Sequence, residues 1–204
     1  MSGVGRWVMV LIFAALASCG SEPGPSGAAG AGGTGGAPPG DGGDCQTVVA
    51  THLIEGAQHV AVCSPLSYAT NPPSSGNHYA IWADYRTYQR PIQRGFWVHS
   101  LEHGAVVITY NCPEGCAEEV TAAQTFVDGL PADCGPMARR VILTPDPELD
   151  VRFAASAWGA TLRASCFDRA TFSAFFSDHY DHAPESICGG GTDPTALCGP
   201  SIGL

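Results

Sequence analysis

The sequence predicts an α+β domain: a mostly antiparallel sheet with two main helices packed on one face, stapled by disulfide bonds. Three observations predict this class. Short β-branched segments recur along the chain, two segments have the apolar spacing of helices, and eight of the nine cysteines follow the first, Cys19. Strands and helices do not alternate regularly, which favours an α+β arrangement over a parallel α/β sheet.

The start of the chain predicts a secretion signal. Arg6 supplies a positive charge, and the apolar run over residues 7–17 is short for a membrane span. The run ends in LASC at Cys19, which resembles the bacterial lipobox. The resemblance implies a signal peptide over residues 1–18 and lipidation of Cys19, which would hold the protein on a membrane. The alternative is an ordinary signal peptide with an incidental cysteine.

A linker is expected between this anchor and the domain. Residues 20–44 are mostly Gly, Ala, Pro, Ser and Thr, without a large apolar side chain. Such a composition cannot bury enough surface to offset the entropy of ordering. We therefore expect a lipidated, disordered linker over 19–44, a single globular domain over 45–190, and a Gly- and Cys-containing tail over 191–204.

The strands are predicted from β-branched and buried apolar segments. They cover residues 46–63 (two short strands or a hairpin around Glu55-Gly56), 105–110, 140–145, and 151–165 with a bend at Gly159.

The helices are predicted over 117–130 and 168–180. The first has one apolar face and two glutamates in its first turn, where they oppose the positive end of the helix dipole. The second begins after Asp168, a favourable N-cap residue. Residues 82–97, where aromatic residues and arginines mix without a regular period, are expected to form a long structured loop.

Composition excludes several classes of function. The formal net charge is −10, and all nine basic residues are arginines. An acidic chain without a basic stripe argues against nucleic acid as a partner. The absence of lysine excludes Schiff-base chemistry and a P-loop mechanism.

The cysteines after Cys19 predict up to four disulfide bonds in an oxidising compartment. The candidates are Cys45, Cys63, Cys112, Cys116, Cys134, Cys166, Cys188 and Cys198. Proximity in sequence favours Cys45–Cys63 and Cys188–Cys198, with the other four pairing among themselves. A zinc site built from these thiols is the alternative.

A histidine-rich segment over residues 71–110 is the candidate site. A Pro- and Gly-containing turn precedes His78, and the string HSLEH contains His99, Glu102 and His103. In inverzincins, H-x-x-E-H lies on a helix. Here a glycine and a strand follow at once, and residues 96–98 are expected to be extended, which argues against a protease helix. A single helical turn would still bring the two histidines of the string together.

Imidazole and carboxylate are ligands for zinc, copper or iron. His78, His99 and His103 are therefore predicted to bind a transition metal, zinc or copper, with Glu102 as a ligand or orienting group. The alternative is that these histidines only hydrogen-bond loops to one another. Further histidines are His179 and His182, candidates for a fourth ligand or an acid–base partner, and His52 and His59, interpreted as ordinary strand histidines.

Two linked motifs carry a family resemblance. PPSSGNHY at 72–79 and HSLEHGAVVITY at 99–110 are similar to the paired motifs of a bacterial domain of unknown function, DUF3105. AWG at 157–159 and HAPE at 182–185 resemble this family as well. Ser74 stands where the family favours threonine, and Asn77 stands where it favours proline. The resemblance covers roughly residues 56–185 and implies a shared domain but no activity.

Three functions remain open. The first is an exported lipoprotein, anchored to the membrane through Cys19, at the periplasmic face of the outer membrane where the cell has one, whose domain binds a transition metal. The second is a metal-assisted hydrolase with Glu102 as general base. The third is a non-catalytic module in which the aromatic loop from Trp82 to Trp97 contacts a protein or glycan partner. In each case we expect a monomer.

Overall fold

The computed structural model describes residues 45–134 and 139–199. The predicted signal peptide, the lipidated Cys19 and the linker lie outside these described residues, as do residues 200–204 of the predicted tail. The elements are β1 (Thr47–Thr51), β2 (His59–Val60), β3 (His78–Tyr79), α1 (Arg94–Glu102), β4 (Val106–Tyr110), α2 (Ala117–Gly129), β5 (Val141–Pro145), β6 (Phe153–Ala157), β7 (Ala160–Ala164) and α3 (Arg169–His179).

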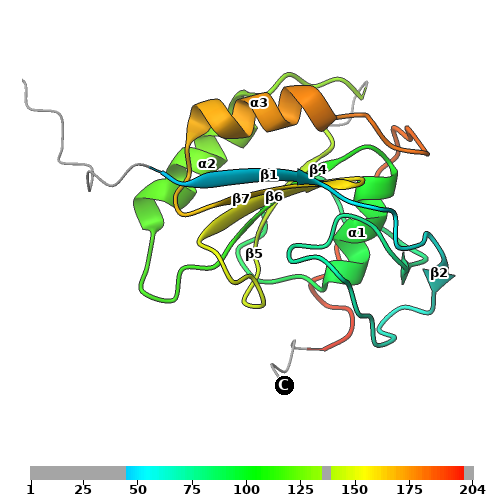
Figure 1. Cartoon of the computed structure of the whole chain (residues 1–204). Helices are drawn as coiled ribbons and strands as arrows, with labels where there is room; N and C mark the ends of the chain where they lie inside the picture. Colours follow the sequence, from blue (N-terminus) through cyan, green and yellow to red (C-terminus); the bar gives the residue numbers. More distant parts are fainter. Residues whose placement is uncertain (1–44, 135–138, 200–204) are drawn as a thin grey trace, which may run out of the picture. The chain divides into compact units, whose positions relative to one another are not determined.

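Two sheets are present in the described part of the chain. The larger has five strands in the order β1-β7-β6-β4-β5 (Figure 1). Three of its pairings are antiparallel, and only β4 and β5 run parallel. The smaller sheet consists of β2 and β3, which pair in parallel. The α+β class with a mostly antiparallel sheet is therefore confirmed.

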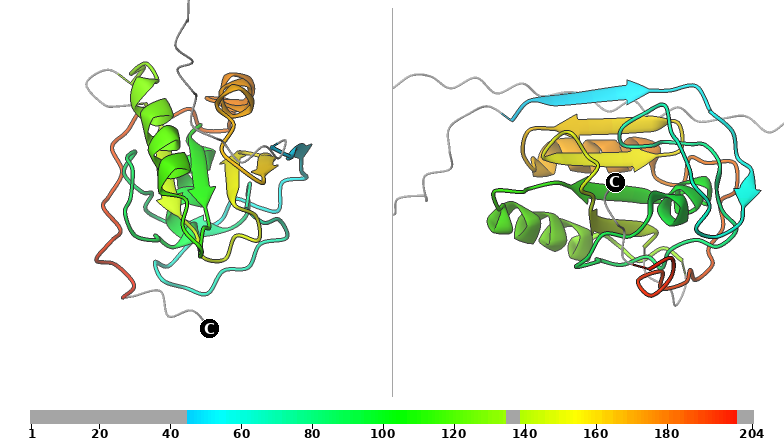
Figure 2. Two further views of the ribbon diagram at one scale, coloured as in Figure 1. Left: turned by 90° about the vertical axis from the view of Figure 1, so that its left-hand side faces the viewer. Right: turned by 90° about the horizontal axis from the view of Figure 1, so that it is seen from below.

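The three helices cover both faces of the five-stranded sheet. Phe126 of α2 and Phe172 of α3 pack with Val106 of β4 in one apolar cluster. Val107, the next residue of β4, belongs to a second cluster with Phe96 of α1. Because successive strand residues point to opposite faces, α2 and α3 share one face and α1 covers the other (Figure 2). Two main helices on one face are confirmed, and α1 adds a layer that the sequence did not predict.

None of the described helices is long and apolar enough to span a membrane.

Two strand predictions differ from the structure in connectivity. Residues 46–63 contain two strands, but they do not form a hairpin, because β1 pairs with β7 and β2 pairs with β3. Residues 151–165 form two antiparallel strands, β6 and β7, rather than one bent strand. The predicted bend is the turn at Gly159, where φ is +75° and glycine has no steric penalty.

The expectation of extended backbone at residues 96–98 is wrong, because these residues are part of α1. Every residue from Gly95 to Glu102 is buried, so the helix has no exposed face to give it an amphipathic period. A helix buried on all sides cannot be recognised from spacing alone. Its burial also explains why the aromatic residues between 82 and 97 point inward: Trp97 is fully buried and Trp82 is half-buried.

The predicted local disulfides are wrong. The cysteines form four bonds: Cys45–Cys166, Cys63–Cys198, Cys112–Cys116 and Cys134–Cys188. Three of them join segments distant in sequence, because β1 and the C-terminal segment return to distant parts of the domain. With all eight sulfurs in disulfides, the structure leaves none of them as thiolates for the alternative zinc site.

Candidate metal centre

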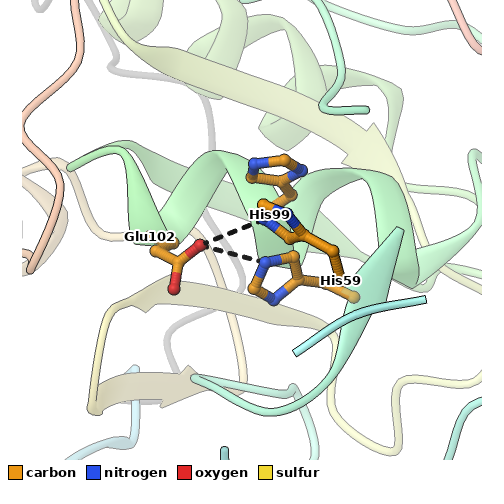
Figure 3. A group of neighbouring side chains, drawn as sticks. His59, His99 and Glu102 are labelled. Atoms are coloured by element: carbon orange, nitrogen blue, oxygen red, sulfur yellow. Dashed lines mark ion pairs between the residues drawn. The ribbon is translucent and has the colours of Figure 1, made fainter. Parts of the chain in front are cut away.

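Three histidines and one glutamate converge beside α1. They are His59 of β2, His78 of β3, and His99 and Glu102 of α1, and each offers a ligand atom within 4.8 Å of the others. Figure 3 shows the His59 and His99 rings beside the Glu102 carboxylate. The ring centroids of His78 and His99 lie 4.7 Å apart. The turn before His78 and the HSLEH string thus lie close together. We call these four residues the four-residue cluster.

The small sheet positions two of these histidines. The pairing of β2 with β3 places His59 directly opposite His78. Before β3 the chain turns at Gly76, whose φ is +115°. The amide of Gly76 donates to the carbonyl oxygen of Gly56, and the amide of His78 donates to that of Gln58. The turn predicted from SGN therefore fixes the direction in which His78 enters the site.

Main-chain carbonyls fix the tautomers of His78 and His99, the two buried histidines of the four-residue cluster. Nδ1 of His78 lies 2.8 Å from the carbonyl oxygen of Gly76, and Nδ1 of His99 lies 2.7 Å from that of Tyr79. A carbonyl oxygen only accepts hydrogen bonds, so each Nδ1 is the donor and carries the proton. In the neutral ring, Nε2 then has the free lone pair. This is the arrangement found in metal-binding histidines, whose other nitrogen is held by a carbonyl or carboxylate.

Glu102 brings a carboxylate into this buried site. Its side chain is only 6% exposed, and its Oε2 lies 3.0 Å from Nε2 of His78 and 3.7 Å from Nε2 of His59. Although the first distance is short, the two atoms are not aligned as a hydrogen bond, and Nε2 of His78 has no other partner among the described residues. The lone pairs of His78 Nε2 and Glu102 Oε2 would repel each other at this distance unless a proton or a cation lies between them.

Burial favours the cation over the proton. Desolvation lowers the pKa of His78, although the Gly76 carbonyl and the Glu102 carboxylate oppose the shift. Desolvation, with added repulsion from His78 and His103, lowers the pKa of His99 to about 3. Both rings are therefore neutral near pH 7, and their lone pairs are available as metal ligands.

His103 belongs to a second group. It is the residue after α1, and its Nε2 points to Glu185, with 3.2 Å between Nε2 and Oε2. Glu102, His103 and Glu185 offer ligand atoms that also lie within 4.8 Å of one another. We call these three residues the three-residue group; Glu102 belongs to both. Desolvation lowers the pKa of His103, with Glu185 opposing the shift.

The family model for a protein of unknown function, DUF3105, matches residues 59–190. The chain belongs to the DUF3105 family. No curated protein and no solved structure matches the chain. The resemblance in the paired motifs PPSSGNHY and HSLEHGAVVITY is thereby confirmed, and all six residues of the two groups, from His59 to Glu185, lie within the matched segment.

The DUF3105 domain brings together some of the predicted site residues and not others. His78, His99 and Glu102 meet in the four-residue cluster, whereas His103 faces Glu185 in the three-residue group. The two histidines of H-x-x-E-H therefore do not share one ligand group as they do in an inverzincin. Their ring centroids are nevertheless 4.6 Å apart, as expected for positions i and i+4.

The remaining histidines lie outside both groups. Nε2 of His52 is 2.8 Å from Oγ1 of Thr161, which fits its interpretation as a strand histidine. The ring of His179 packs against Phe175, and Nδ1 of His182 donates to the carbonyl oxygen of Asp178 in an exposed position. Neither C-terminal histidine supplies a fourth ligand in this structure.

The sequence interpretation missed His59 and Glu185. His59 lies on a strand of only two residues, and nothing before folding indicates that it pairs opposite His78. Glu185 is the last residue of HAPE, one of the segments that resemble DUF3105, and that motif was the available signal. Its amide donates to the carbonyl oxygen of Glu102, which brings the C-terminal segment to the end of α1.

Gly104 ends α1 in a conformation that favours glycine. Its φ is +87°, and a Cβ there would lie 2.8 Å from Nη1 of Arg140 and 3.0 Å from Cα of Asp181. We expect Gly104→Ala to lower the free energy of unfolding by about 2–4 kcal/mol, from backbone strain and overpacking together. Gly115, with φ +90° and open space around its Cβ position, is the matched control. Gly115→Ala should cost only the backbone component, about 1–2 kcal/mol; equal losses in urea unfolding would contradict the packing argument.

The buried histidines predict how the stability of the metal-free DUF3105 domain depends on pH. The pKa of His99 falls from 6.5 in the unfolded chain to about 3 in the native protein. Below pH 6.5 the unfolded chain therefore binds more protons than the native one. Stability should be full above pH 6.5 and fall between pH 6.5 and 3, by up to about 1.4 kcal/mol per pH unit for this group.

Urea unfolding of the metal-free protein between pH 7.5 and 4.5 measures this slope. His99→Asn, which keeps a polar side chain but does not titrate, should flatten it. An unchanged slope in that variant would show that another group is responsible.

Proposed function

We propose that this DUF3105 protein is a lipid-anchored cell-envelope protein whose domain binds a divalent transition metal through the four-residue cluster of His59, His78, His99 and Glu102. Elements β2, β3 and α1 supply these ligands.

The observation that carries the proposal is the buried carboxylate of Glu102 among the imidazoles of the cluster. In the described part of the chain its Oε2 lies close to Nε2 of His59 and of His78, and no arginine forms an ion pair with it. A buried negative charge is costly unless a positive charge compensates it. A cation bound to Oε2 and to the free Nε2 atoms would supply that charge and give the unpartnered Nε2 of His78 a partner.

The donor set favours zinc or copper. Three imidazole nitrogens and one carboxylate oxygen suit zinc in a tetrahedral site, and imidazoles also suit copper. Three of the four residues are buried, whereas the His59 side chain is 48% exposed. The ion would thus be held from the protein side by His78, His99 and Glu102 and reached from solvent at His59.

The same arrangement supports a ligand role for Glu102 rather than the role of general base in a hydrolase. A general base acts on a water molecule bound to the metal, whereas Oε2 of Glu102 lies within 3.7 Å of two candidate ligand nitrogens. The aromatic-loop alternative receives little support, because Trp97 is fully buried.

Export and anchoring rest on the chemistry of the chain. The apolar segment ending at Cys19 and the Gly-rich residues after it support a lipid anchor with a flexible linker. The four disulfides support an oxidising compartment.

The metal content of the purified protein tests the metal proposal. After zinc loading and dialysis, the wild type should retain zinc in a fixed ratio to protein, and His99→Ala should bind it at least ~100-fold more weakly, since losing even an outer-shell partner costs 10–100-fold. His182→Ala is the control, because His182 is exposed and lies outside both groups. A wild type that retains neither zinc nor copper would contradict the proposal.

A further inference from the structure

We infer that the site is binuclear: Glu102 bridges the ion of the four-residue cluster and a second divalent transition metal held by His103 and Glu185. The inference rests on the proposed function for its first ion. The second ion is assigned from the geometry of the three-residue group.

The distances between candidate ligand atoms are the first argument for a second ion. Two ligand atoms ~2.1 Å from one ion and roughly 90–110° apart lie about 3.0–3.4 Å from each other. Nε2 of His103 and Oε2 of Glu185 are 3.2 Å apart. In the four-residue cluster, Nε2 of His78 and Oε2 of Glu102 are 3.0 Å apart. Both pairs thus have the separation of atoms that share one ion.

The carboxylate of Glu102 carries the second step, because it belongs to both groups. Its contacts with His59 and His78 use only Oε2, which leaves Oε1 for a second cation. A carboxylate can bind one ion through each oxygen, and proteins hold such paired ions about 3.5–4 Å apart. His99 belongs to the first group and His103 to the second, and their ring centroids are 4.6 Å apart.

The carboxylates of the three-residue group have no arginine partner. Among the described residues, no arginine forms an ion pair with Glu102 or Glu185. His103 is buried beside both carboxylates, and its Nδ1 has no partner among the described residues. The nearby guanidinium of Arg140 is already paired, at 2.7 Å, with Oδ1 of Asp181.

The alternative role of Glu185 is to hold the C-terminal segment against α1. Main-chain hydrogen bonds already do this: the amide of Glu185 donates to the carbonyl oxygen of Glu102, and the amide of Asp181 donates to that of Gly104. The Cys134–Cys188 disulfide fixes the same segment. The Glu185 carboxylate is therefore not needed as a latch and remains available as a ligand.

Each position has one ligand that reaches solvent. The Glu185 side chain is 46% exposed and the His59 side chain 48%, whereas His78, His99 and His103 are buried. The second ion would have three protein ligands, which leaves a coordination position for water, as in catalytic zinc sites. Water bound there would be the acidic, reactive group of the site.

Metal stoichiometry of the full chain tests the inference. Wild-type protein, Glu185→Gln and His103→Ala are loaded with Zn²⁺, dialysed and measured by elemental analysis, with Co²⁺ loading for electron paramagnetic resonance. We expect two zinc ions per chain in the wild type and one in each variant. The wild type should also show magnetic coupling between two Co²⁺ ions, and Glu185→Gln should give the signal of an isolated ion.

Each other outcome overturns the inference in a distinct way. One ion in the wild type removes the second site and leaves the proposed function intact, whereas none removes both. Two ions in Glu185→Gln would show that Glu185 is not a ligand. Because Glu185 is half-exposed, its variant tests the site even if His103→Ala does not fold. Glu148→Gln, at a carboxylate 74% exposed and distant in sequence, is the control and should bind two ions.

Discussion

Glu102→Gln is expected to stabilise the metal-free protein by about 1–3 kcal/mol, the order of the penalty for an uncompensated buried polar group, and to remove the stabilisation that zinc gives the wild type. Glutamine keeps the shape of the side chain but not its charge. In the wild type, zinc at 100 times its dissociation constant should contribute about 2.7 kcal/mol. The two effects have opposite signs, so urea unfolding with zinc and with a chelator separates them.

The competing explanation predicts a different sign. If His78 were an imidazolium paired with Glu102, removing the carboxylate would leave a buried positive charge and cost about 3–5 kcal/mol. A large loss of stability in metal-free Glu102→Gln would therefore contradict the metal site. Glu148→Gln removes an exposed carboxylate and should change stability by no more than about 0.5 kcal/mol with or without zinc.

Removing the Cys45–Cys166 disulfide is expected to cost far more than removing Cys112–Cys116. The first bond joins residues 121 apart and the second joins residues 4 apart. Loop-closure entropy predicts losses of about 5 and about 2 kcal/mol for the double Cys→Ser variants. The first bond also ties β1, an edge strand with Val48 64% exposed, to the end of β7.

Urea unfolding of the two double-serine variants under oxidising conditions checks this order. Hydrogen exchange should show loss of protection in β1 of the variant without Cys45–Cys166 and not in the other. Equal losses of stability, or a β1 that remains protected, would mean that pairing with β7 alone holds this strand.

The sequence was sufficient for elements with a clear local signal, either one apolar face or a continuous apolar run. Helix α3 was predicted from the helical spacing of its apolar residues, and Phe172 and Phe175 are indeed buried. Its N-cap is the predicted one: Asp168 accepts a hydrogen bond from the amide of Thr171. Strand β5 was predicted because it is an almost uninterrupted apolar run that ends at Pro145. In these segments, the apolar residues that form the sequence pattern are the same residues that the fold buries.

The parts that sequence reasoning missed depend on tertiary contacts. Helix α1 is buried on every side, so its residues have no alternation to detect. His59 becomes part of the site only through its pairing opposite His78, and Glu185 only through a main-chain contact with Glu102. Four of the six candidate ligands were therefore predictable from the HSLEH and SGNH strings, and the other two join the site only through folding.

The two-stranded sheet of β2 and β3 bears on whether folding or metal binding comes first. It supplies His59 and His78 but shares no strand with the five-stranded sheet. The cluster of Phe126, Phe172 and Val106 contains none of the candidate ligands. The larger core can therefore form, and its disulfides can close, before any ion is present. Under the proposed function, the chain would be exported without metal and would bind its ion in the cell envelope. The metals available there would then determine which ion it binds.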